Sequence, residues 1–223
     1  MDSRRFTRPQ LAFAMGVPLA WAVLLWFHPD VPPDDVYGGL RDEVTTYIIV
    51  HVGTLIFIAL LGVVLYMLVS DLPGRAARIA RVAVIPFVVC YAAWETVIGL
   101  AVGALVQHAN DSPASDRPAM ADAIQSLGDN AIVGEAGVLV SVGAIAWAVA
   151  VIAAAVAFHG VGAPLMASVL LGLSAIVVSH PPPIGPIGLV CFAGAVALLA
   201  RSEHVAATLP TPRPAAAGTP ASA

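Results

Sequence analysis

Six long apolar runs alternate with short polar segments along the chain. The runs cover residues 11–27, 47–69, 82–106, 131–158, 163–179 and 184–200. Roughly 20 apolar residues in a helix that rises about 1.5 Å per residue are enough to cross the hydrocarbon core of a bilayer. Each run is therefore predicted to form a transmembrane helix, and the prolines of residues 180–186 predict a tight turn between the last two.

The composition indicates a membrane environment. Apolar residues make up 59% of the 223 positions and charged residues 11%, whereas a soluble domain has roughly half and a quarter. Six spans with short connections use nearly the whole of residues 1–204, which predicts one all-α membrane domain without a separate soluble catalytic domain. The Pro/Ala-rich segment 205–223 is predicted to be a disordered cytoplasmic tail.

The arginines predict the orientation of the bundle. The predicted topology places most of them on one side: Arg4, Arg5, Arg8, Arg75, Arg78, Arg81, Arg201 and Arg213. The opposite side holds only Arg41 and Arg117 among many acidic residues. Positive-inside bias then places both termini in the cytoplasm. Because no run of basic residues occurs, nucleic acid is not an expected partner.

The longest outer connection, residues 107–130, is predicted to contain a short amphipathic helix. Met120, Ile124 and Leu127 recur there at helical spacing. Such a helix could cap the outer end of the bundle.

Glu95 is the one acidic residue expected near the middle of a span. An ionised acid at that depth costs about 2.5–3.5 kcal/mol, so it must face the interior, be protonated or find a partner. Gly99 and Gly103 follow at helical spacing, which places all three on one face and predicts a close helix contact there. Glu95 is either a proton- or substrate-binding carboxylate or a protonated acid that is hydrogen-bonded to its neighbours.

Several potential metal ligands are predicted at the outer ends of the spans: His28, His51, His108, Glu135 and His180. Imidazole and carboxylate ligands suit zinc, which needs three or four of them, and His51 with Glu135 are the most deeply placed. No HxxxH or HExxH pair is present. The same histidines allow a second interpretation, in which two imidazoles hold a haem.

The chain resembles a family of six-helix bacterial membrane proteins known only as a domain of unknown function. The similar features are an acid after an aromatic stretch (Tyr91 to Glu95), the Leu127-Gly-Asp sequence before the fourth span, and short Gly-rich closing spans. The resemblance covers about the last two-thirds of the chain. It implies a six-helix architecture in a bacterial plasma membrane and implies no activity.

Three functional hypotheses follow from these features. The first is a small-molecule or proton-linked binder or transporter that uses Glu95, for which a polar cavity should continue from that residue. The second is a metal-dependent membrane enzyme, resembling a lipid hydrolase, whose outer histidines and Glu135 should converge. The third is a haem-binding or structural accessory subunit, for which the bilayer is the main partner.

Overall fold

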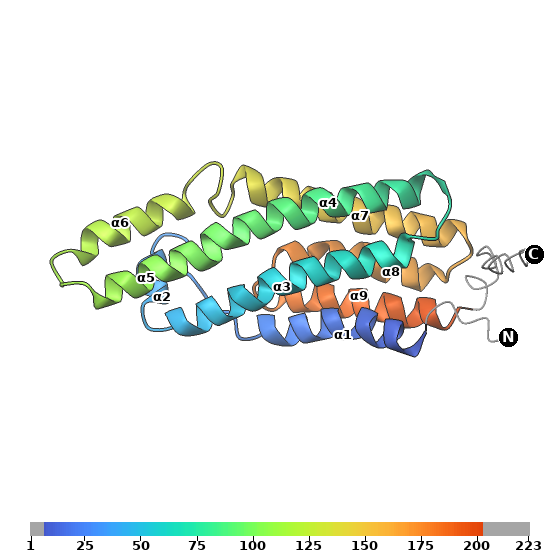
Figure 1. Cartoon of the computed structure of the whole chain (residues 1–223), viewed down its shortest axis with the longest axis horizontal. Coiled ribbons are helices and arrows are strands. Elements are labelled where there is room, and N and C mark those ends of the chain that lie inside the picture. Colours follow the sequence, from blue (N-terminus) through green and yellow to red (C-terminus); the bar gives the residue numbers. More distant parts are fainter. Residues whose placement is uncertain (1–6, 203–223) are drawn as a thin grey trace, which may run out of the picture.

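The computed structural model describes residues 7–202, and within this range it contains helices and no strand (Figure 1). The helices in chain order are α1 (Arg8–Leu25), α2 (Val36–Leu40), α3 (Val44–Val69), α4 (Gly74–Glu95), the π-helix η1 (Thr96–Ala101), α5 (Val102–Asp111), α6 (Arg117–Gly128), α7 (Val138–Gly160), α8 (Leu165–Leu173), the 3-10 helix η2 (Ser174–Val178) and α9 (Ile184–Ala200). The all-α prediction is confirmed for these residues. The predicted tail, 205–223, lies outside them.

Four helices are long and apolar enough to cross a membrane. They are α1, α3, the continuous α4–η1–α5 helix and α7. The fifth and sixth apolar runs also form helices, but α9 has only 17 residues and α8 with η2 has 9 and 5. At about 1.5 Å per residue these cover roughly 26 and 21 Å, less than the hydrocarbon core of about 30 Å.

The long helices lie side by side and turn apolar side chains outward. In the bundle α4 packs against α7, α1 against α9, and α3 against both α1 and α4. Large apolar residues on the outer surfaces are more than half exposed, among them Ile56, Val63, Ile85, Val89, Ile152 and Val156. Water-soluble monomers rarely present so much apolar surface, and lipid accommodates it without cost.

Two spans differ in length from the predicted runs. The third run, predicted over 82–106, is part of one helix from Gly74 to Asp111. The fourth, predicted from residue 131, begins as a helix only at Val138. Residues 131–137 form turns because the Asn130 side-chain oxygen accepts bonds from two backbone N–H groups, those of Ile132 and Val133, at 2.9 and 3.2 Å.

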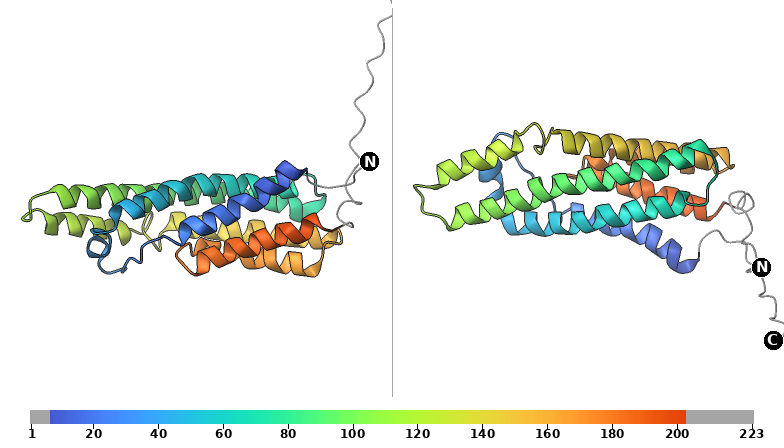
Figure 2. Two further views of the ribbon diagram at one scale, coloured as in Figure 1. Left: turned by 90° about the horizontal axis from the view of Figure 1, so that it is seen from below. Right: turned by 45° about the horizontal axis from the view of Figure 1, so that its top comes forward.

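The predicted amphipathic helix in the longest outer loop is confirmed as α6. Its Ile124 is buried, and Met120 and Leu127 pack against the core. The Gln125 side chain accepts a bond from the Val36 N–H at 3.3 Å and donates to the Pro33 carbonyl at 2.8 Å. Figures 1 and 2 show α5, α6 and α2 continuing past the ends of α1 and α9, so they form a cap at this end of the bundle.

The predicted close helix contact at Gly99 and Gly103 is also present. A Cβ atom at Gly99 would lie 2.5 Å from the His51 ring, and one at Gly103 would lie 2.6 Å from Ile48. Real Cβ contacts are not this short, so glycine lets the backbones of η1 and the start of α5 approach α3 here. The contact holds the His51 ring directly against η1.

Candidate metal centre

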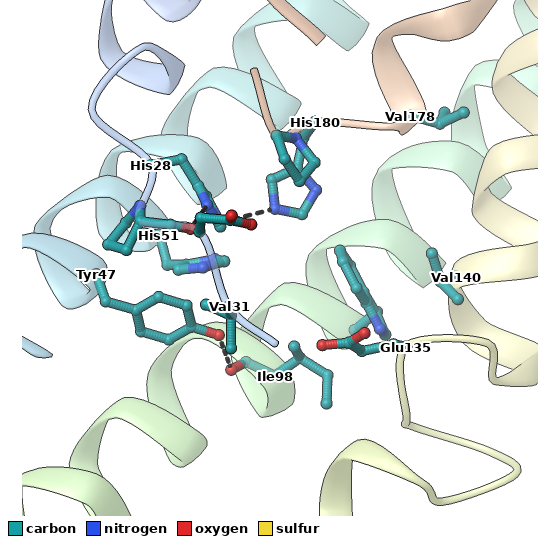
Figure 3. Close-up of a pocket in the computed structure, with 13 residues that line it drawn as sticks. His28, Val31, Tyr47, His51, Ile98, Glu135, Val140, Val178 and His180 are labelled. Atoms are coloured by element: carbon teal, nitrogen blue, oxygen red, sulfur yellow. Dashed lines mark hydrogen bonds between the residues drawn. The ribbon is translucent and has the colours of Figure 1, made fainter. Parts of the chain in front are cut away.

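Three histidines from three different segments meet at the capped end of the bundle. His28 follows α1, His51 lies two turns into α3, and His180 lies between η2 and α9. One ring nitrogen of each lies within 4.8 Å of the others, and the ring centroids are 4.9 to 5.6 Å apart. Figure 3 shows the three imidazoles grouped on one side of a cavity.

Glu95 belongs to the same group. Its Oε2 lies 2.5 Å from His51 Nδ1 and its Oε1 lies 3.9 Å from His180 Nε2. The carboxyl group is fully buried, as is His51 at 1% exposure. The sequence had placed Glu95 near mid-span and apart from the histidines. Glu95 does lie near the middle of the continuous Gly74–Asp111 helix. That helix continues through η1 and α5 beyond the ends of α1 and α9, so Glu95 lies level with those ends and beside the histidines.

The hydrogen bonds of His180 and His28 define which ring nitrogen carries the proton. The Tyr91 hydroxyl donates its only hydrogen to the Val178 carbonyl at 2.7 Å, so in its 3.3 Å contact with His180 Nδ1 the nitrogen must donate. His28 Nδ1 lies 2.7 Å from the Pro29 carbonyl and must donate as well. In both neutral rings Nε2 is therefore left with a bare lone pair.

These two lone pairs face each other. The Nε2 atoms of His28 and His180 are 3.3 Å apart. Two acceptors at this distance repel unless a proton or a cation lies between them. The arrangement of the two rings therefore favours a bound positive charge.

His51 presents a third nitrogen of the same kind. Its Nδ1 donates to the Glu95 carboxylate, which leaves Nε2 with a lone pair that is buried and has no hydrogen-bond partner. Glu95 Oε1 is likewise buried without a partner. Buried polar atoms are nearly always satisfied, so a nitrogen and an oxygen left unpaired on two residues in contact indicate a missing ligand.

The two histidines outside the helices are neutral at ordinary pH. Burial, followed by the neighbouring His51, lowers the pKa of His28 to about 4. Burial lowers the pKa of His180 to about 3, although the Glu95 carboxylate acts in the opposite direction. Neutral imidazole is the form that binds metals, so no proton has to be removed from either ring near pH 7.

The histidines line a cavity of about 240 Å³. Asp30 and Glu135 line it, and Figure 3 shows Glu135 across the cavity from the histidines. Partial burial and the nearby Asp129 raise the pKa of Glu135 above its usual range. Glu135 is thus part of the cavity wall, while the three-histidine group contains neither Glu135 nor His108, which is exposed on α5.

Two tyrosines and the π-helix hold the walls of the site. Besides the bond from Tyr91 described above, the Tyr47 hydroxyl donates to the Ile98 carbonyl in η1 at 2.7 Å (Figure 3). The π-helix begins directly after Glu95. Such segments are rare and occur frequently at functional sites, where they reposition side chains within a longer helix.

Toward the opposite end the bundle is closed by apolar side chains. About one helical turn after His51 along α3, Thr54 is buried and accepts a hydrogen bond from the Trp21 indole N–H at 3.2 Å. Further along α3, Ile58, Leu61 and Leu65 are fully buried. Within residues 7–202 the buried polar side chains are His51, Thr54, Glu95, Ser174 and His180, so no polar path continues through the bundle.

The sequence alone could have predicted that Glu95 lies beside His51, from the distance of each residue to the turn between α3 and α4. His51 lies 21 positions before Leu72 and Glu95 lies 22 positions after Pro73. The short turn between α3 and α4 makes these helices antiparallel neighbours, so residues equidistant from it lie at one height. Tyr91, one helical turn before Glu95, was missed as a partner of His180, because nothing local in the sequence links positions so far apart.

Comparisons of the chain with protein-family models, with curated proteins and with solved structures found no match. The resemblance to a family of unknown function therefore stays a prediction. The function has to be argued from the site itself.

Proposed function

We propose that this protein is a membrane metalloenzyme in which His28, His51 and His180 bind one zinc ion beside Glu95, and that it hydrolyses an ester or amide. The observation that carries the proposal is the set of three imidazoles, two of them buried and that of His28 partly buried, whose Nδ1 atoms are all engaged and whose Nε2 lone pairs are free. In known metal sites an outer partner on the second ring nitrogen fixes the tautomer of each ligating histidine in the same way.

The spacing of the nitrogens supports a tetrahedral ion. Zinc–nitrogen bonds of about 2.0–2.1 Å place two ligating nitrogens about 3.4 Å apart. The 3.3 Å between His28 Nε2 and His180 Nε2 agrees with this value. A ring nitrogen of His51 lies within 4.8 Å of the other two rings' nitrogens and needs to approach by up to about 1.4 Å. Three protein ligands and one open position are typical of catalytic zinc.

Glu95 supports hydrolysis rather than a purely structural ion. Zinc lowers the pKa of a water that it binds to about 7. Glu95 Oε1, 3.9 Å from His180 Nε2, is placed to accept the proton of that water. A zinc ion held by the three histidines would supply activation of the attacking water. Glu95 would hold the proton of that water and return it to the leaving alcohol or amine as the ester or amide bond breaks.

The alternatives have weaker support. Transport that uses Glu95 requires a polar path, and apolar side chains close the described part of the bundle beyond Thr54. A haem requires two imidazoles on opposite faces of a flat macrocycle. Here three rings and a carboxylate converge on one point, with ring centroids as close as 4.9 Å, which leaves no slot for the macrocycle.

The direct test is metal binding by the purified full chain. We expect close to one zinc per chain by elemental analysis after dialysis against trace zinc. Cobalt exchanged for zinc should give the intense visible absorption of a tetrahedral ion. Protein that holds neither metal above a tenth of an equivalent would refute the proposal, and a Soret band in its place would support the haem interpretation.

We further infer that all six apolar helices cross a bacterial plasma membrane, with both termini in the cytoplasm and the metal centre near the outer surface. The arginine distribution supports this orientation, and a locally thinned bilayer accommodates the shorter α8–η2 and α9. Alkaline phosphatase, active only outside, should be active when inserted after Ser115 or Pro182. It should be inactive after Gly74 or Gly162. An inactive insertion after Pro182 would contradict six crossings.

A further inference from the structure

We infer that the substrate is an amphiphile whose acyl chain lies in an apolar groove between α1 and α9 while its ester or amide group reaches the metal centre. This inference rests on the proposed zinc site and adds the substrate class to it. The groove has a volume of about 540 Å³. Its walls include Leu19 and Val23 from α1, Phe27 in the turn after it, and Ile187, Val190 and Cys191 from α9.

The groove and the polar cavity are lined, on both walls, by residues that are close to one another in the chain. Phe27 lines the groove and the next residue, His28, lines the cavity. On the other wall Pro186 lines the groove, and the loop that leads into α9 provides His180 and Pro181 to the cavity. Figure 2 shows α1 and α9 side by side along their length. A molecule in the groove therefore has one end beside the histidines.

The apolar groove and the polar cavity together indicate which kind of molecule binds there. The groove runs from Leu19 in α1 to Phe27 just after it, eight steps along the chain or roughly 12 Å at about 1.5 Å per residue. Its walls are apolar and partly exposed on the outer surface of the bundle, with Val23 63% and Val190 54% exposed. Within a bilayer the surrounding molecules are lipids, so an acyl chain fills such a groove. The cavity next to it holds histidines and carboxylates, which match a polar group on the same molecule.

A second apolar groove provides an internal comparison. It lies between α3 and α4, has a volume of about 410 Å³ and includes Val63 and Val89 among its walls. Val63 lies 12 residues beyond His51, roughly 18 Å along α3. No residue of this groove lines the cavity. It therefore presents a similar apolar surface without access to the metal centre.

The test uses hydroxamic acids, which bind catalytic metals directly, on the cobalt-loaded full chain in detergent. Acetohydroxamic acid and dodecanohydroxamic acid are titrated while the cobalt absorption is monitored. We expect the long-chain probe to bind more tightly. Val23→Trp should fill the groove and weaken the long-chain probe by roughly tenfold, because its headgroup then loses the tethering that a seated chain provides. Binding of acetohydroxamic acid should be unchanged. Val63→Trp, at a similarly exposed valine in the second groove, should change the affinity for neither probe.

The outcomes separate the two proposals. Failure to load cobalt would refute the metal centre itself. Normal loading and a normal response to acetohydroxamic acid, together with a long-chain affinity that Val23→Trp leaves unchanged, would refute the groove alone. An equal loss of affinity for the long-chain probe in Val63→Trp would show that the acyl chain of the probe acts only by partitioning into detergent. That result would also overturn the inference.

Discussion

Replacing His51 by alanine is expected to abolish stoichiometric zinc binding. His51 supplies one of three imidazole nitrogens, and its ring also holds Glu95 through the 2.5 Å bond to Nδ1. Loss of an outer partner alone typically costs about 10–100-fold in metal affinity. Loss of a direct ligand together with its carboxylate contact should exceed that range. Zinc per chain and competition with a chromogenic chelator measure the effect.

His108→Ala is the matched control for this experiment. His108 was predicted in the same ligand set, but it is exposed on α5 and outside the group of three. Its replacement should leave zinc stoichiometry and affinity unchanged. Since His51→Ala also opens a buried space, His28→Ala provides a second variant at a position outside the helices. Full zinc binding by both His51→Ala and His28→Ala would remove the basis for the site.

The sequence predicted the residue types of the proposed metal site, but not which of those residues lie close together. Positive-inside bias and span lengths place His28, His51 and His180 at one end of the bundle. The same argument places His108 at that end. The prediction that His108 groups with the other histidines is wrong, because α5 extends past the site and places His108 in the cap. A depth argument gives height along the bundle axis. It does not predict which face of its helix a residue occupies, or which neighbouring helix packs against that face.

The contact between Glu95 and the histidines was less predictable, because hydropathy does not show how far a long helix continues past its neighbours. The predicted run ends at residue 106, whereas the helix extends from Gly74 to Asp111 and includes the π-turn of η1. A π-segment has no sequence signature as clear as a proline or a glycine pair. The hydrogen bonds that set the tautomers, such as that between Tyr91 and the Val178 carbonyl, join positions 87 residues apart. Local patterns do not encode such pairings.

Glu95→Gln is expected to separate catalysis from metal binding. A glutamine side-chain oxygen can still accept the bond from His51 Nδ1–H, so the ring orientation and most of the zinc affinity should be retained. The amide nitrogen that replaces Oε1 cannot accept a proton from water. Turnover of a chromogenic ester such as p-nitrophenyl octanoate should therefore fall by roughly 10²–10⁴-fold, the usual contribution of a general base. Zinc content should remain near one per chain.

A second carboxylate in the cavity, that of Glu135, provides a comparison for the role of Glu95 as the base. Glu135 lines the same cavity, and Glu135→Gln should reduce turnover much less than Glu95→Gln, because only Glu95 contacts a ligand ring. The opposite order would assign the base to Glu135 and leave Glu95 as a residue that positions His51. Zinc-loaded wild-type protein that turns over no ester or amide would limit the site to metal binding. A loss of zinc in Glu95→Gln would instead show that its carboxylate is needed to hold the ion, since the amide keeps the bond to His51 but removes the charge.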